Sequence, residues 1–229
     1  MFSGVISNLR LEYRNQLGVL KSQIIEIADF VSDIFGQTIE VVQNNNISLA
    51  KKISESDAEV DQMGRNIEDN CLRIVSLQSP FASDLRMVTG YIKIVNDFER
   101  IADQCAEVCE IVSMGNLSKK CVICSNKAVS ILEEAFRVYK RTCDACFSLD
   151  AKEAKQIFLD DDKIDLMFSD IIFYISNSIS KDSSIVSSAA DLMFISKYAE
   201  RMADHCVNIS KWIIYINYGF FPDKKYFIQ

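Results

Sequence analysis

The chain has 229 residues, of which 49% are apolar and 25% are charged, and its formal net charge is −7. This composition can fill a hydrophobic core, which excludes an intrinsically disordered chain. The acidic balance argues against nucleic-acid binding, which needs a basic face, and no run of about 18 apolar residues predicts a membrane span. The charged N-terminus does not resemble a signal peptide, so we expect a cytoplasmic protein.

Long helices are favoured throughout, because the sequence contains only two Pro and seven Gly. Apolar residues recur at helical spacing in six segments of about 30 residues each. In chain order these segments cover residues 9–42, 48–77, 80–112, 118–147, 151–179 and 185–218. Asn-rich, Pro-containing, Gly-Asn and Ser-rich stretches separate them, and such stretches favour turns and helix ends.

The second half of the sequence repeats the first. Residues 99–103 read Glu-Arg-Ile-Ala-Asp and residues 200–204 read Glu-Arg-Met-Ala-Asp, an offset of 101. Residues 57–61 align with residues 161–165 at an offset of 104. This duplication predicts an all-α protein of two tandem, pseudo-symmetric three-helix bundles. We expect the first bundle over residues 1–115, the second over 116–219 and a short C-terminal tail over 220–229.

Paired acidic residues mark the duplicated segments. Each pair is spaced i, i+4, so its two carboxylates lie on one helix face and repel each other unless a cation lies between them. If the second and third helices of each half are antiparallel neighbours, four carboxylates can face one another, and such oxygens suit Mg, Ca, Mn or Fe. The candidate metal ligands are Asp57, Asp61, Glu99 and Asp103 in the first half, and Asp161, Asp165, Glu200 and Asp204 in the second.

A second interpretation of the acids also stays open. The chain has 32 acidic residues, and acid pairs on a solvated helix face are common in such a sequence. Asp29 and Asp33 form such a pair without a counterpart in the second half, and we assign them to the surface. The single histidine, His205, follows Asp204 and can be a ligand, a support for one or a surface residue.

The cysteines do not form a convincing zinc site. Cys121, Cys124, Cys143 and Cys146 have the spacing of a zinc ribbon. The residues between the two pairs keep helical periodicity, and a continuous helix separates the pairs by about 30 Å. We interpret these cysteines as core residues. The sequence also lacks a Gly-rich phosphate loop and a nucleophile elbow, so we do not expect an enzyme.

Three segments carry a resemblance to a known family. Asp84-Leu85-Arg86, Lys93-Ile94 and the segment 99–103 resemble the first-half signature of the PhoU family. Residues 200–209 resemble its second-half signature, and the resemblance covers essentially the whole chain. It implies two three-helix bundles that bind metal through the candidate acids. One multinuclear cluster is implied in each half, with iron favoured and Mn, Zn or Mg as alternatives.

The same resemblance implies a regulatory role. PhoU proteins restrain the phosphate-starvation response through a membrane sensor histidine kinase and the ATPase of a phosphate ABC transporter, so this chain is expected at the inner face of the membrane through these partners. We also expect a homodimer. Two alternatives are a metal-dependent hydrolase of phosphate esters and an accessory subunit of a different phosphate permease.

Overall fold

The computed structural model describes residues 2–55, 57–78, 80–115, 122–160 and 162–223, and the side chains of residues 2–11, 57, 78, 122 and 123 are not described. All regular elements in these ranges are helical. They are α1 (Phe2–Asn44), α2 (Ile47–Ser54), α3 (Asp57–Gln78), α4 (Ala82–Ser113), α5 (Val122–Ser148), α6 (Ala151–Leu159), α7 (Asp162–Lys181), a 3₁₀ turn (Ser183–Ile185) and α8 (Val186–Tyr218).

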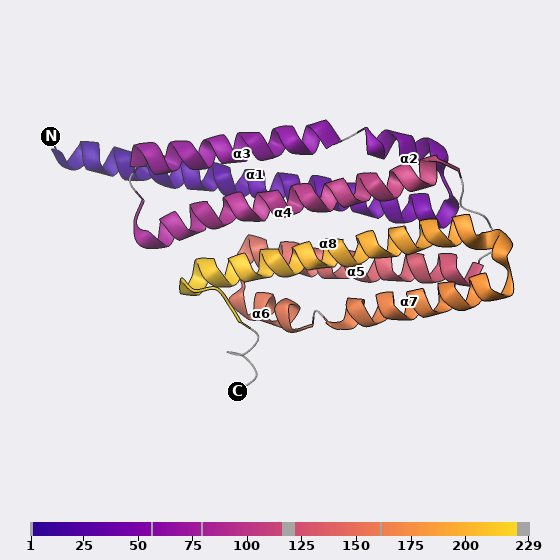
Figure 1. Ribbon diagram of the computed structural model, residues 1–229. Coiled ribbons are helices and arrows are strands. Elements are labelled where there is room, and N and C mark those ends of the chain that lie inside the picture. The colour runs from indigo at the N-terminus through magenta and orange to yellow at the C-terminus, as the bar shows by residue number, and fades with distance from the viewer. Residues whose placement is uncertain (1, 56, 79, 116–121, 161, 224–229) are drawn as a thin grey trace.

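The helices form two bundles that lie side by side (Figure 1). Helices α1 to α4 make the first bundle and α5 to α8 make the second, with α4 and α8 antiparallel along the seam between them. The contact of α4 with α8 is the most extensive between any two elements, and α1 also packs on α5. Within the described ranges, no helix is long and apolar enough to cross a membrane.

The predicted all-helical duplicated architecture is confirmed, but two of the six predicted helices are interrupted. The first break lies between Ser54 and Asp57, and the second lies at the matching place between Leu159 and Asp162. Helix α4 begins at Ala82 after Phe81, two residues later than the start predicted at Pro80. The helix ends predicted near Gly115 and Gly219 are confirmed. Both glycines adopt a positive φ, which favours Gly at the end of a helix.

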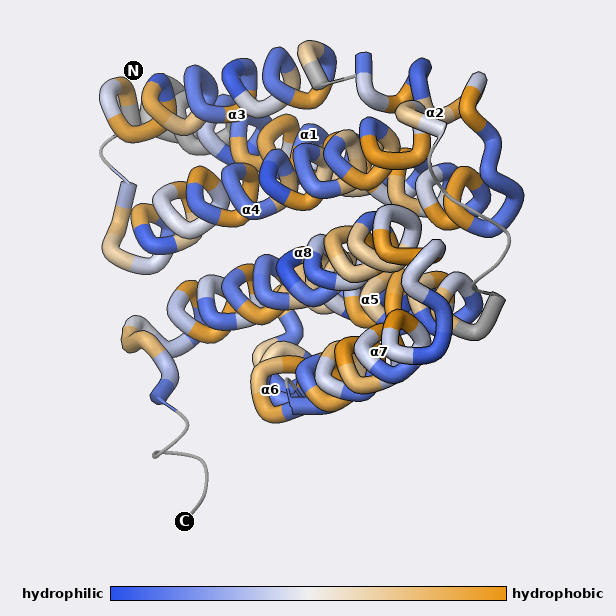
Figure 2. Tube along the Cα trace, turned by 45° about the vertical axis from the view of Figure 1, so that its right-hand side comes forward, coloured by the Kyte–Doolittle hydropathy of each residue, from blue (hydrophilic) through white to orange (hydrophobic). Residues whose placement is uncertain are grey.

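Apolar and polar residues alternate along the helices (Figure 2), and most of the buried residues in the described ranges are apolar. Tyr139 of α5 joins the two bundles: its ring lies 5.9 Å from that of Phe35 on α1 and 6.0 Å from that of Phe98 on α4. Its hydroxyl donates to the Ala28 carbonyl at 2.6 Å. The bundles therefore share one core, and the buried residues form one continuous cluster across both.

Burial follows the offsets read from the sequence. Val60 and Ile67 of α3 are buried, and so are their counterparts Ile164 and Ile171 of α7. The apolar residues inside the two duplicated Glu-Arg-x-Ala-Asp segments, on α4 and α8, are buried in the same way. Corresponding positions therefore occupy equivalent places in the two bundles, which allows the acids of the two halves to be compared one by one.

Replacing Phe98 by Ala should destabilise the whole molecule, because this ring is fully buried where α4 meets α5. We expect a loss of about 3–5 kcal/mol in the free energy of unfolding, measured by urea denaturation. The control is Phe173→Ala on α7, whose side chain is 65% exposed and which should cost less than about 1 kcal/mol. Equal losses in the two variants would show that α4 and α5 are not packed through this ring.

Candidate metal centre

The carboxylates of the first half are positioned by the burial of their neighbours on α4. Ile101 and Ala102 are buried in the core, so the side chains of Glu99 and Asp103 lie at the edge of that face, half-buried. Helix α3 packs beside this edge. The i, i+4 pair on α4 is therefore turned toward a neighbouring helix and not toward open solvent.

Glu99 lies directly against the backbone of α3 at Gly64. A Cβ atom added to Gly64 would overlap Glu99 Oε1, so a side chain at position 64 would displace the carboxylate. Burial, and after it the negative charges of Glu68, Asp61 and Asp103, raise the pKa of Glu99 to about 7, although the nearby Arg100 acts to lower it. Four carboxylates from α3 and α4 thus lie close enough to repel one another.

Three of these four carboxylates have a partner. Asp61 lies 3.6 Å from Arg65, and Asp103 lies 3.1 Å from Arg100; both arginines are largely exposed, and such pairs contribute little. Asn96, with its amide oriented to satisfy both of its polar atoms, donates to Glu68 at 3.2 Å.

Glu99 differs from the other three. Among the residues that the structure describes, no base lies within ion-pair distance of its carboxylate, and no hydrogen bond to it is formed. Of the four carboxylates, the half-buried Glu99 is therefore the one without an ion pair or hydrogen bond in these ranges, and the charge of Arg100 reaches it only at longer range.

A metal ion would have to draw these acids together. Within the described ranges, no three His, Cys, Asp or Glu side chains already converge closely enough to hold an ion. The predicted ligand Asp57 begins α3, but its side chain is not described. The donor set nevertheless fits a hard cation, since it consists of oxygens from two adjacent helices. The space beside Gly64 keeps one of those oxygens close to α3.

The matching acids of the second half are arranged differently. Asp161 lies outside the described residues, and both Asp165 on α7 and Asp204 on α8 are exposed. Glu200 is 13% exposed and forms an ion pair with Lys197, one turn earlier on α8. The Lys197 ammonium also lies 5.2 Å from the centre of the Phe168 ring on α7. An ammonium thus stands beside Glu200, where the resemblance would place a metal ion, and the second half fits the implied cluster poorly.

Sequence reasoning missed three residues that shape these sites. Glu68 lies seven residues after Asp61, two helical turns along the same face, and this spacing could have revealed it. Gly64 lies between them in the middle of a helix, where Gly is unfavourable and therefore signals close packing. Lys197 lies three residues before Glu200, a spacing that permits an ion pair on a helix.

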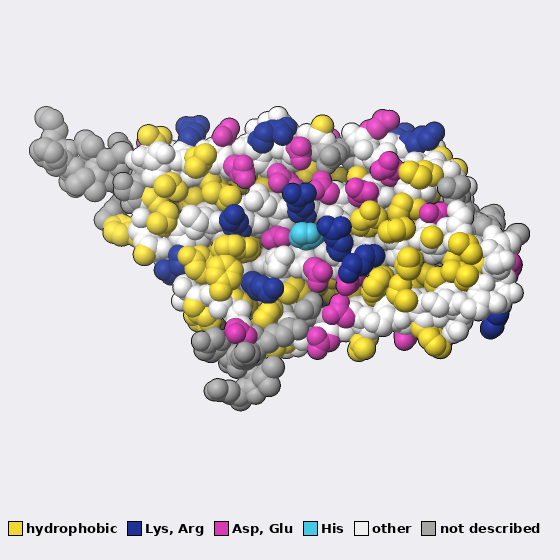
Figure 3. All heavy atoms as spheres, viewed as in Figure 1, with side chains coloured by type: hydrophobic (Ala, Val, Ile, Leu, Met, Phe, Trp, Pro, Cys, Tyr) yellow, Lys and Arg dark blue, Asp and Glu magenta, His cyan; other side chains and the backbone are white. Residues whose placement is uncertain are grey.

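In the described ranges, His205 and the cysteines belong to no group of three potential metal ligands. His205 Nδ1 lies 2.8 Å from Asp97 Oδ1, so the histidine joins α8 to α4 across the seam; it is the cyan side chain near the centre of Figure 3. Helix α5 is continuous, and Cys124, Cys143 and Cys146 are buried along it, as predicted. Cys121 lies outside the described residues, and Cys124 is separated from Cys143 by about five helical turns, too far to share an ion.

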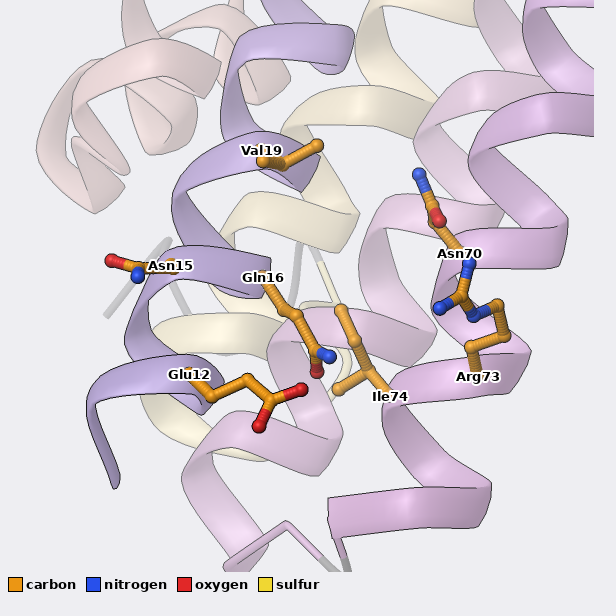
Figure 4. A pocket seen from close by; sticks show the side chains of 7 residues that line it. All are labelled: Glu12, Asn15, Gln16, Val19, Asn70, Arg73 and Ile74. Carbon is orange, nitrogen blue, oxygen red and sulfur yellow. The ribbon is translucent and has the colours of Figure 1, made fainter. Parts of the chain in front are cut away.

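Two cavities lie outside the groups of candidate ligands, and the first of them borders the acids of the first bundle. One, of about 450 Å³, lies on the seam and is lined by Arg100, Arg201, Tyr198 and Glu107 among others. The other, of about 320 Å³, lies between α1 and α3 and is lined by Glu12, Asn15, Gln16, Val19, Asn70, Arg73 and Ile74 (Figure 4). Neither contains a nucleophile with an adjacent base, so neither indicates catalysis.

Comparison with known proteins decides the family. The model described as "PhoU domain" matches residues 24–112 and again residues 128–213, one match for each bundle. The chain belongs to the PhoU family. The candidate acids at positions 57–103 and 161–204 lie within these two matched ranges.

The curated relatives of this PhoU-family chain are similar over most of their length. The phosphate-specific transport system accessory protein PhoU of Escherichia coli is 26% identical over 204 residues, which cover 89% of this chain and 84% of that protein. The homolog from Zymomonas mobilis is 28% identical and covers 90% of this chain and 87% of that protein. Both are named as accessory proteins, in line with the prediction that this chain is not an enzyme.

Solved structures show the same fold. The crystal structure of PhoU from Pseudomonas aeruginosa superposes with a TM-score of 0.84 at 23% identity, and covers 91% of this chain and all of that chain. The phosphate transport system regulatory protein PhoU from Streptococcus pneumoniae superposes with a TM-score of 0.81 at 21% identity, and covers 94% of this chain and 99% of that chain. The two-bundle architecture is therefore that of the family.

The raised pKa of Glu99 predicts a pH dependence in metal-free protein. The folded state holds the Glu99 proton more tightly than the unfolded chain does, so Glu99 contributes most to stability below its ordinary pKa of 4.5. That contribution is lost as the pH rises through about 7. We expect the free energy of unfolding, measured in chelator by urea denaturation, to fall over this interval. Glu99→Gln should reduce the fall.

The control for this measurement is Asp33→Asn, which removes an exposed carboxylate from α1. It should leave the pH dependence unchanged. An identical slope in the wild type and in Glu99→Gln would show that the charge of Glu99 is well solvated in the folded protein.

Proposed function

We propose that this PhoU-family protein restrains the phosphate-starvation response in the cytoplasm. It acts as an adaptor between the ATPase of a phosphate ABC transporter and a membrane sensor histidine kinase. The match of both bundles to the family model supports this role, as do the names of the relatives, which describe accessory proteins of phosphate transport. Adaptor function also agrees with the architecture, since long helices present broad surfaces and the loops between them are short.

We further propose that the first bundle binds iron or another divalent metal ion through Asp61, Glu99 and Asp103, with Asp57 and Glu68 as additional donors. The observation that carries this proposal is the half-buried Glu99 carboxylate, which lies against Gly64 among other acids and has no base within ion-pair distance in the described ranges. A bound cation would offset the repulsion among these acids and would link α3 to α4.

The acids are also placed to influence a partner surface. Figure 3 shows acidic side chains gathered on the exposed side of α3 and α4. A cation held there would reduce the negative charge of this surface. It would also fix the position of α3, which begins just after the interruption between α2 and α3. Metal binding would thereby alter both the shape and the charge that a partner meets.

Metal content tests the proposed site. We expect full-length protein purified without chelator to contain metal by elemental analysis, and Glu99→Ala/Asp103→Ala to lose most of it while remaining helical by circular dichroism. The matched control is Asp29→Ala/Asp33→Ala, which removes an acid pair of the same spacing from α1 and should leave the metal content unchanged.

A second variant tests the geometry without removing any ligand. Gly64→Ala adds one methyl group beside Glu99 Oε1, and we expect it to lower metal content because the carboxylate must move away. Absence of metal from the wild type, even after incubation with Fe²⁺ or Mn²⁺, would refute the metal proposal. The acids would then be ordinary acids of a solvated surface.

Deletion of the gene tests the regulatory role. We expect a phosphate-starvation reporter to become active in phosphate-rich medium when the gene is absent, and to be repressed again by the wild-type gene. The Glu99→Ala/Asp103→Ala gene should restore repression less well than the Asp29→Ala/Asp33→Ala gene. Normal repression in the deletion strain would contradict the proposed role.

A further inference from the structure

The two bundles differ at three matched positions around their central glutamate. At an offset of 104, Gly64 and Glu68 of α3 correspond to Phe168 and Ile172 of α7. At an offset of 101, Asn96 of α4 corresponds to Lys197 of α8. The first bundle thus has a glycine against which Glu99 packs, an extra acid and a neutral amide, whereas the second has a ring, an aliphatic side chain and an amine.

These three differences act together in the second bundle. Phe168 stands where Gly64 leaves room for Glu99, so α7 offers no comparable space to Glu200. The Lys197 ammonium pairs with the Glu200 carboxylate and lies over the Phe168 ring, a position that favours a cation. Ile172 contributes no negative charge where Glu68 does. The charge of Glu200 is therefore balanced from within the chain.

A second cluster, on α5 and α7, shows the same contrast between the bundles. The buried Glu134 accepts from Lys163 Nζ at 2.7 Å and from Arg137 Nε at 3.0 Å. At an offset of 104, the first bundle has Glu59 in place of Lys163 and Asp33 in place of Arg137. Bases of the second bundle thus stand where the first bundle has acids.

We propose that Lys197 is a built-in cation that takes the place of a metal ion in the second bundle, so that only the first bundle binds metal. This inference rests on the proposed metal site of the first bundle. The Lys197 ammonium is tethered one turn from Glu200, so it competes with any ion in solution at an effective concentration on the order of millimolar. An ion would also have to bind without the space that Gly64 provides and without a counterpart of Glu68.

The proposal predicts that the lysine can be transplanted. Asn96→Lys places an amine three residues before Glu99, the spacing that joins Lys197 to Glu200. It removes none of the proposed carboxylate ligands. Asn96→Gln is the matched control, because it changes the length of the side chain and keeps it neutral.

Binding of Mn²⁺ to the full-length protein provides the test. Chelator-treated wild type and variants are equilibrated with Mn²⁺, separated from free ion and measured by elemental analysis, with folding checked by circular dichroism. We expect Asn96→Lys to lose most of the bound Mn²⁺ and Asn96→Gln to keep most of it. We expect Glu200→Ala/Asp204→Ala to bind as much as the wild type.

The outcomes separate this inference from the proposed metal site. If Glu200→Ala/Asp204→Ala loses about half of the bound Mn²⁺, both bundles bind metal, and the role given to Lys197 is wrong while the first site stands. Full retention of Mn²⁺ by Asn96→Lys would also overturn that role. If the wild type binds no Mn²⁺, the first site fails and the inference fails with it.

Discussion

A carboxylate that is partly removed from water needs a positive charge nearby, and this requirement governs the architecture around both central glutamates. Ile101, Ala102 and their counterparts are buried in the core, Glu99 lies against Gly64 of α3, and Glu200 lies against Lys197 of its own helix. Glu200 receives its positive charge from Lys197. Glu99 lies among other acids with no base at ion-pair distance in the described part of the chain. The first bundle is therefore the one in which we propose an external cation.

The seam between the bundles makes this difference relevant to regulation. Tyr139 contacts aromatic rings on α1 and α4, and His205 contacts Asp97 across α4 and α8, so the bundles share both a core and a polar link. Helices α4 and α8 are therefore in direct contact along the seam. The proposed metal ion would join α3 to α4 on one side of this shared core, and the second bundle would be balanced by its own lysine.

The sequence predicted the fold well because the fold depends on periodic burial. The scarcity of Gly and Pro, the helical spacing of apolar residues and the duplicated segments all point to two helical bundles, and the structure agrees. The breaks before Asp57 and Asp162 were missed because they contain neither Gly nor Pro. Their signal was weaker: Ser and Asp residues gather there, and these residues favour helix starts.

The candidate site was less accessible to sequence reasoning, because it depends on which groups lie across from each other. The duplicated acid pairs could be found from spacing alone, and Glu99 and Asp103 do lie near Asp61. The acids of the two halves looked equivalent, since their difference is carried by residues outside the shared motif. Gly64 and Lys197 became informative only when the structure showed that each lies against a central glutamate.

Anomalous diffraction from crystals of the full-length protein grown with Mn²⁺ tests the central claim most directly, because it locates the ions. The account predicts anomalous density beside Glu99, between α3 and α4, and none beside Glu200, where the Lys197 ammonium should remain paired with the carboxylate. Density of equal height beside Glu200 would contradict the claim that the two bundles balance their charge in different ways. Absence of density beside Glu99 would contradict the metal site itself.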